Sequence, residues 1–197
     1  MKPLAALAFL LAAAFAPAAQ ALPVVYVASL SGAAEEPPNA SPGMGWSRAT
    51  IDLSALTLRV EAGFSGLLAP STVAHIHAPT AVPGEGNVGV AVQTPTLLGF
   101  PAGVTEGAYD MTFDLGAPGT YAAGFLNNAG FGDPLGAASA LADALAQGRA
   151  YFNLHTDQFP AGEIRGFYAS IPVPAAGLLL PLALAALGLA AARARPG

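Results

Sequence analysis

The chain has 197 residues, with twelve acidic residues against seven basic ones, a net charge of −5 and no cysteine. Without cysteine the protein can form no disulfide and no thiolate metal site. Residues 22–170 hold all twelve acids and only four arginines. A segment this acidic repels phosphate backbones, so we expect no nucleic-acid binding.

The N-terminal segment has the pattern of a removable export signal. Lys2 gives a positive start, and an unbroken apolar run follows over residues 4–15. Ala19 and Ala21 then place small residues at the two positions that a signal peptidase reads. The run is too short for a membrane span, which takes about 20 apolar residues. We therefore expect cleavage of residues 1–21 after Ala21, with a retained N-terminal anchor as the alternative.

Residues 22–170 are long enough to form one domain with its own core. Short β-branched and aromatic runs, separated by Gly- and Pro-rich turns, predict that most of this domain consists of strands. The expected strands are 24–30, 46–53, 56–64, 73–77, 88–93, 109–115, 149–155 and 163–168. Strands this short and this regularly spaced predict an antiparallel sandwich or barrel.

Two helices are expected between the sixth and seventh of these strands. A short one falls within residues 120–127. The second has clear limits, because Asp133 is a good N-cap, Pro134 suits the first turn and Gly148 provides a stop. Apolar residues recur at helical spacing between these limits.

The last two strands are expected to pair as a hairpin around residues 156–162. A register that places Asn153 opposite Arg165 puts polar residues, among them His155 and Glu163, on one face. The other, apolar face is expected to join the core, with Phe152, Leu154, Ile164 and Tyr168. We expect Glu163 and Arg165 to be structural residues that hold the hairpin, through an ion pair or cross-strand hydrogen bonds. Glu163 has no partner acid at a spacing typical of catalysis.

The chain has three histidines, and all three can share one face. His75 and His77 alternate within one strand and therefore point the same way. His155 lies on the polar face of the closing hairpin. If these two strands are neighbours, three imidazoles converge, and three nitrogen ligands suit zinc or copper. The alternative is that the histidines hydrogen-bond to backbone and carboxylate groups and hold the strands together.

Three stretches resemble the CHRD domain, a family named for chordin, an animal inhibitor of bone morphogenetic proteins. They are AHIHAP at 74–79, the Gly-rich turn that leads into 88–90, and AYFNLHT at 150–156 with PAGEIRG at 160–166. The resemblance implies an immunoglobulin-like β-sandwich over residues 22–170, with no established enzymatic activity. It implies no growth-factor role, because this domain is only one part of chordin.

The C-terminal segment combines a Pro motif, an apolar run and a basic end. Pro172 and Pro174 precede eighteen uncharged residues, 175–192, and Arg193 and Arg195 follow. This run is near the lower limit for a spanning helix, and arginines after it favour a cytoplasmic C-terminus. The order resembles the PEP-CTERM sorting signals of Gram-negative bacteria, with Ile-Pro-Val-Pro where the commoner motif is Val-Pro-Glu-Pro.

That resemblance implies that residues 171–197 act as a sorting tail. The protein would pass through the inner membrane, be processed by an exosortase-type enzyme, and reach the cell surface or the extracellular matrix. A plain C-terminal membrane anchor is the alternative interpretation of the same residues.

The leading hypothesis is an exported, non-enzymatic surface or matrix module that needs no cofactor. A second hypothesis is a zinc- or copper-binding protein, or a metalloenzyme, that uses His75, His77 and His155. The His-x-His motif resembles that of the copper/zinc superoxide dismutases, but three histidines do not supply the full ligand set of those enzymes. A third hypothesis is a structural matrix component without a specific ligand.

Deletion of residues 171–197 should release the domain into soluble fractions or the medium, because the expected span and sorting motif both lie in this tail. Cell fractionation of the full and truncated chains, followed with an antibody against the domain, measures the change. An unchanged distribution among membrane, surface and soluble fractions would contradict the sorting role of the tail.

Overall fold

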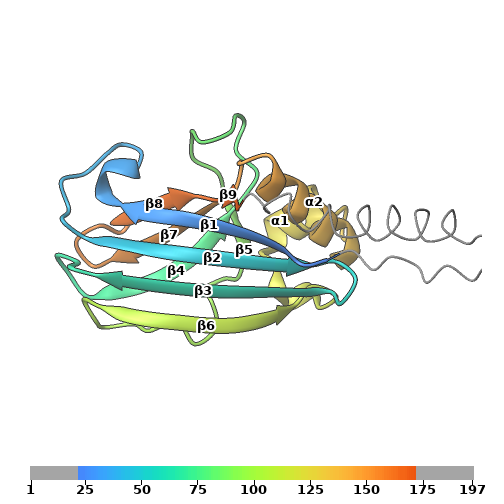
Figure 1. Cartoon of the computed structure of the whole chain (residues 1–197), viewed down its shortest axis with the longest axis horizontal. Coiled ribbons are helices and arrows are strands. Elements are labelled where there is room, and N and C mark those ends of the chain that lie inside the picture. Colours follow the sequence, from blue (N-terminus) through green and yellow to red (C-terminus); the bar gives the residue numbers. More distant parts are fainter. Residues whose placement is uncertain (1–21, 172–197) are drawn as a thin grey trace, which may run out of the picture.

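An antiparallel sheet carries most of residues 22–171, the part of the chain that this computed structural model describes (Figure 1). Its strands are β1 (Val24–Ser31), β2 (Met44–Asp52), β3 (Thr57–Ser65), β4 (Ser71–His77), β5 (Val90–Val92), β6 (Gly107–Asp114), β7 (Tyr151–Thr156), β8 (Ile164–Phe167) and β9 (Ala169–Ser170). The hydrogen-bonded order is β5-β4-β7-β8-β1-β2-β3-β6, and β9 also pairs with β1. Two single turns of 3-10 helix are η1 (Gly32–Ala34) and η2 (Pro118–Thr120).

The sheet is curled, so that β4 and β7 lie behind β1, β2 and β3 in Figure 1. The two halves of the strand order meet where Ser31 of β1 pairs with Arg165 of β8. The expected mainly β, antiparallel class with two short helices is therefore confirmed. Within the described residues, the strands expected to form a sandwich or a barrel make one continuous, curled sheet, because β8 bonds to β7 on one side and to β1 on the other.

The inner faces of both halves share one apolar core. Leu58 and Val60 of β3 and Ile76 of β4 are fully buried there. The closing hairpin has the expected register, with Asn153 opposite Arg165. Its inward side chains are Phe152, Leu154, Ile164 and Tyr168, as expected. Because side chains alternate along a strand, every second residue of β4 and β7 points away from this core.

Helices α1 (Ala123–Asn128) and α2 (Pro134–Ala146) close one end of the sheet (Figure 1). The helix α2 begins as expected, because the backbone N–H of Leu135 donates to the Asp133 carboxylate at 3.2 Å. It is followed by Gly148, whose φ of +66° suits a residue without a Cβ. Apolar side chains of α2 then pack against the core of the sheet.

No helix within residues 22–171 is both long enough and apolar enough to cross a membrane. The expected signal segment 1–21, with its cleavage site at Ala21, lies outside the described residues. So does the expected sorting tail after Ile171, including Pro172, Pro174, Arg193 and Arg195. The assignments of these two segments remain sequence predictions.

A fully buried carboxylate, Glu163, joins three segments of the chain. Its Oε1 accepts hydrogen bonds from Oγ of Ser41 at 2.6 Å and from the backbone N–H of Leu68 at 2.7 Å. Its Oε2 accepts one from Oγ1 of Thr156 at 2.7 Å, across the closing hairpin. Glu163 therefore holds the hairpin, as expected, and also two loops that the sequence did not connect with it.

The substitution Glu163→Ala should lower the free energy of unfolding by about 3 kcal/mol or more, because three donors lose a buried charged acceptor. Glu163→Gln should cost less, since the amide keeps one acceptor oxygen. Urea unfolding followed by tryptophan fluorescence measures both changes. The matched control is Glu106→Ala, at an exposed acid, and an equal midpoint for the two alanine variants would contradict this role of Glu163.

Candidate metal site

Strands β4 and β7 are neighbours, and their register brings the three histidines together. His75 lies opposite Asn153, and Val73 lies opposite His155. His75, His77 and His155 therefore share the face of the sheet that points away from the core. Their ring centroids are between 5.4 and 6.3 Å apart. The two strands are therefore neighbours, as the expected convergence of the three imidazoles requires.

Each histidine uses one ring nitrogen to bond a backbone carbonyl. The pairs are Nε2 of His75 with Pro95 at 2.8 Å, Nδ1 of His77 with Val88 at 2.8 Å, and Nδ1 of His155 with Pro160 at 3.0 Å. A carbonyl oxygen only accepts, so the bonded nitrogen must carry the proton. The second nitrogen of each neutral ring then carries no proton and has a free lone pair. The backbone therefore fixes the tautomer of each histidine.

The three remaining nitrogens face a common space. Nδ1 of His75, Nε2 of His77 and Nε2 of His155 are buried and have no hydrogen-bond partner among the described residues. One nitrogen of each histidine lies within 4.8 Å of the other two. Buried acceptors without partners are costly, and three imidazole nitrogens this close together could hold a cation.

Burial lowers the pKa of all three imidazoles, and the hydrogen bonds to the carbonyls oppose this only in part. The effect is large for His77, whose pKa falls to about 4. The three rings are therefore neutral at pH 7. Neutral imidazole is the form that binds a metal ion.

The face of the sheet next to the histidines carries Tyr151 and Arg165. The Tyr151 ring stacks on the His77 ring, with centroids 4.7 Å apart and an interplanar angle of 3°. Cζ of Arg165 lies 5.0 Å from the centroid of the Tyr151 ring, a cation–π distance. The Tyr151 hydroxyl donates to the Val88 carbonyl at 3.4 Å, the same carbonyl that bonds His77. This stack places a permanent positive charge close to the histidines.

Arg165 is buried and fastens two loops over this face. Its guanidinium donates to Oδ1 of Asn87 at 2.6 Å and to the Gly86 carbonyl at 3.2 Å, and it forms an ion pair with Glu36 at 3.2 Å. The sequence suggested an ion pair with Glu163 as one way to hold the hairpin. In the structure Glu36 has this role, because both oxygens of Glu163 accept hydrogen bonds from neutral donors.

Glu35 is a second buried carboxyl near Arg165 that the sequence did not single out. Burial raises its pKa to about 7, against the opposing effect of the Arg165 guanidinium. Its Oε1 and Oδ1 of Asn153 both lack a hydrogen-bond partner among the described residues. Both oxygens crowd Gly162, where an added Cβ would lie 2.7 and 2.5 Å from them.

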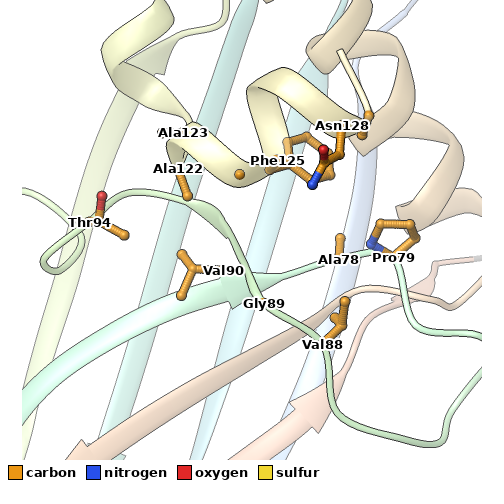
Figure 2. A pocket seen from close by; sticks show the side chains of 12 residues that line it. Ala78, Pro79, Val88, Gly89, Val90, Thr94, Ala122, Ala123, Phe125 and Asn128 are labelled. Carbon is orange, nitrogen blue, oxygen red and sulfur yellow. The ribbon is translucent and has the colours of Figure 1, made fainter. Parts of the chain in front are cut away.

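A pocket of about 620 Å³ borders the site, between α1 and the loop that precedes β5 (Figure 2). Its lining is mostly apolar, with Ala78, Pro79 and Val90 facing Phe125 of α1. Val88 belongs to both features, since it lines the pocket and its carbonyl bonds to His77.

The sequence predicted the three histidines as candidate ligands but not the groups that orient them. Val88, Pro95 and Pro160 act through backbone oxygens, which every residue carries. The only indirect signal is that each stands in or beside a turn rich in Gly or Pro.

Fold and site together define a mainly β domain with a cluster of three imidazoles on the face of the sheet that points away from the core. The chain matches the family model of the CHRD domain over residues 26–168, a span that includes all three histidines. The chain therefore belongs to the CHRD domain family, as its motifs indicated. No curated protein and no solved structure matches it.

Without metal, the histidines should make the protein less stable as the pH falls from about 6.5 to about 4. Unfolded histidines take up protons near pH 6.5, whereas folded His77 does so only near pH 4. The unfolded state binds more protons in this window and is favoured as the pH falls. Glu35 acts in the opposite direction, because its folded pKa of about 7 exceeds its ordinary 4.5.

The variant His77→Phe separates these effects, because it keeps an aromatic ring against Tyr151 and leaves Glu35 in place. Between about pH 7 and about pH 4.5, the wild type should lose about 2–3 kcal/mol more than this variant. Urea unfolding in the presence of a chelator measures the difference. Equal losses in the two proteins would contradict a buried, neutral His77.

Proposed function

We propose that this CHRD domain binds one zinc or copper ion between His75, His77 and His155. Two observations carry the proposal: each ring has a buried nitrogen without a hydrogen-bond partner, and one nitrogen of each ring lies within 4.8 Å of the other two. Buried polar atoms normally have a partner, and each unmet acceptor costs about 1–3 kcal/mol. One cation would satisfy all three.

The donor set suits these two metals. Both zinc and copper bind imidazole nitrogen. At Zn–N distances of about 2.0–2.1 Å, tetrahedral nitrogen ligands are roughly 3.4 Å apart, so side-chain shifts of roughly an ångström would suffice. The carbonyls of Val88, Pro95 and Pro160 provide the outer hydrogen bonds that orient metal-binding imidazoles.

The competing interpretation is that the histidines only hold the strands together. In that case each ring should use both nitrogens in hydrogen bonds. Here each ring uses one, and its other nitrogen is a buried acceptor without a partner among the described residues. Acceptors do not attract one another, so the arrangement supports a ligand site better than a strand contact.

We further propose that the domain acts outside the cytoplasm as a binding module, not as an enzyme. The signal-like segment 1–21 and the PEP-CTERM-like tail support export in a Gram-negative bacterium, with processing by an exosortase-type enzyme and delivery to the surface or matrix. Burial of the ligand nitrogens supports a binding role, because it restricts the approach of a substrate to the ion.

The purified protein, stripped with a chelator, should take up about one zinc or copper ion at neutral pH. His75→Gln and His155→Gln should each abolish this uptake while the fold persists, since each removes one ligand. Val73→Ala, on the same face of β4, is the matched control and should retain the ion.

Elemental analysis after gel filtration gives the stoichiometry, and circular dichroism reports the fold of each variant. A protein that stays metal-free in excess zinc and copper would contradict the proposal. The structural interpretation of the histidines would then stand.

A further inference from the structure

The charges around the histidines favour one ion over the others. We propose that the site selects monovalent copper over zinc and divalent copper, and that three imidazole nitrogens hold it without a fourth ligand from the chain. This inference rests on the proposed function, because it requires that His75, His77 and His155 bind a metal.

The lack of charge on the ligands disfavours a divalent ion. All three are neutral, so the bound ion keeps its whole charge in a buried place. The carboxyl groups nearby are already engaged, since Glu163 accepts three hydrogen bonds, and Glu36 and the buried Glu35 lie 3.2 and 4.0 Å from Arg165. Burying an ion costs free energy that rises with the square of its charge, so the cost for a monovalent ion is about a quarter of that for a divalent one.

A fixed positive charge beside the ligands also disfavours a divalent ion. Arg165 is only 3% exposed, and its guanidinium stacks on Tyr151, which stacks on His77. The side chain of its partner Glu36 is 51% exposed, so water screens the negative end of that pair more than the positive end. Its other partner, Glu35, lies 4.0 Å away, and burial raises the pKa of this carboxyl to about 7, so it carries only part of a negative charge at neutral pH. Repulsion from Arg165 grows with the charge of the ion and therefore disfavours divalent ions more.

The number of nitrogen atoms that are free to bind a metal favours monovalent copper. Zinc sites in proteins have four ligands, and divalent copper prefers square-planar or tetragonal sites. Here three nitrogens converge, while the amide of Asn153, opposite His75, is directed to Ala161 and Gly162. Monovalent copper has a filled d shell and is stable with three nitrogen ligands, so it needs no further group.

The test compares affinities in the purified protein without oxygen. Monovalent copper and zinc are each titrated against a coloured chelator of known affinity, and X-ray absorption counts the nitrogen ligands of the copper form. We expect monovalent copper to bind at least about a hundredfold more tightly than zinc. The reduction potential of the copper form should also lie above that of aqueous copper.

The possible outcomes separate the two proposals. Zinc binding that equals or exceeds that of monovalent copper would overturn this inference and leave the proposed function intact. A bound copper with four ligands from the chain would also overturn it. Binding of neither metal would overturn the proposed function itself.

A pair of variants tests the charge argument directly. Val73 lies opposite His155 on the same face, so Val73→Asp adds a negative charge beside the ligands and removes none. It should lower the preference for monovalent copper over zinc at least about tenfold relative to Val73→Asn, the neutral control of the same shape. Equal preferences in the two variants would refute the argument.

Should Val73→Asp fail to fold, Glu36→Gln provides the same test from the opposite direction. Its half-exposed side chain tolerates change, and loss of the carboxylate leaves only the buried Glu35, at 4.0 Å, to compensate the Arg165 charge. The preference for monovalent copper should rise relative to Glu106→Gln. An unchanged or lower preference would count against the inference.

Discussion

The register between β4 and β7 is the constraint on which both the core and the site depend. With His75 opposite Asn153, the alternation of side chains sends Ile76 and Phe152 into the core and the histidines to the other face. A slip of one residue would exchange the two sets and place imidazoles among apolar side chains. The hydrophobic effect therefore maintains the geometry of the ligands, although no ligand belongs to the core.

Two buried charges organise what lies above that face. Buried charges need partners, and here most of the partners are groups in loops. Glu163 gathers the segments around Ser41 and Leu68, while Arg165 gathers those around Glu36 and Asn87. The loop that holds Asn87 also contains Val88. Arg165 of β8 thus helps to position the Val88 carbonyl, which bonds to His77.

Patterns of residue type at fixed spacing are enough to predict the shared face of the histidines and the pairing of Asn153 with Arg165, because alternation along a strand is visible in a sequence. The same patterns predict the helix that begins after Asp133. They cannot predict the carbonyl partners, since a backbone oxygen has no residue type and its position depends on the path of a loop. Nor can they predict the ion pair of Arg165 with Glu36, whose partners are 129 residues apart. The sequence predicted a sandwich or a barrel but not that one curled sheet forms it, because β8 and β9 both pair with β1 and no local pattern marks this pairing.

The segment between His77 and His155 contains β5, β6 and both helices. An ion shared by these two residues would close that long loop, as a disulfide does, in a chain that has no cysteine. Unlike a disulfide, the cluster exists only after β4 and β7 have paired, so an unfolded chain has no such site to load. A protein that crosses a membrane unfolded could not carry its ion with it. On the proposed export route, the supply of metal beyond the membrane would decide what the domain holds.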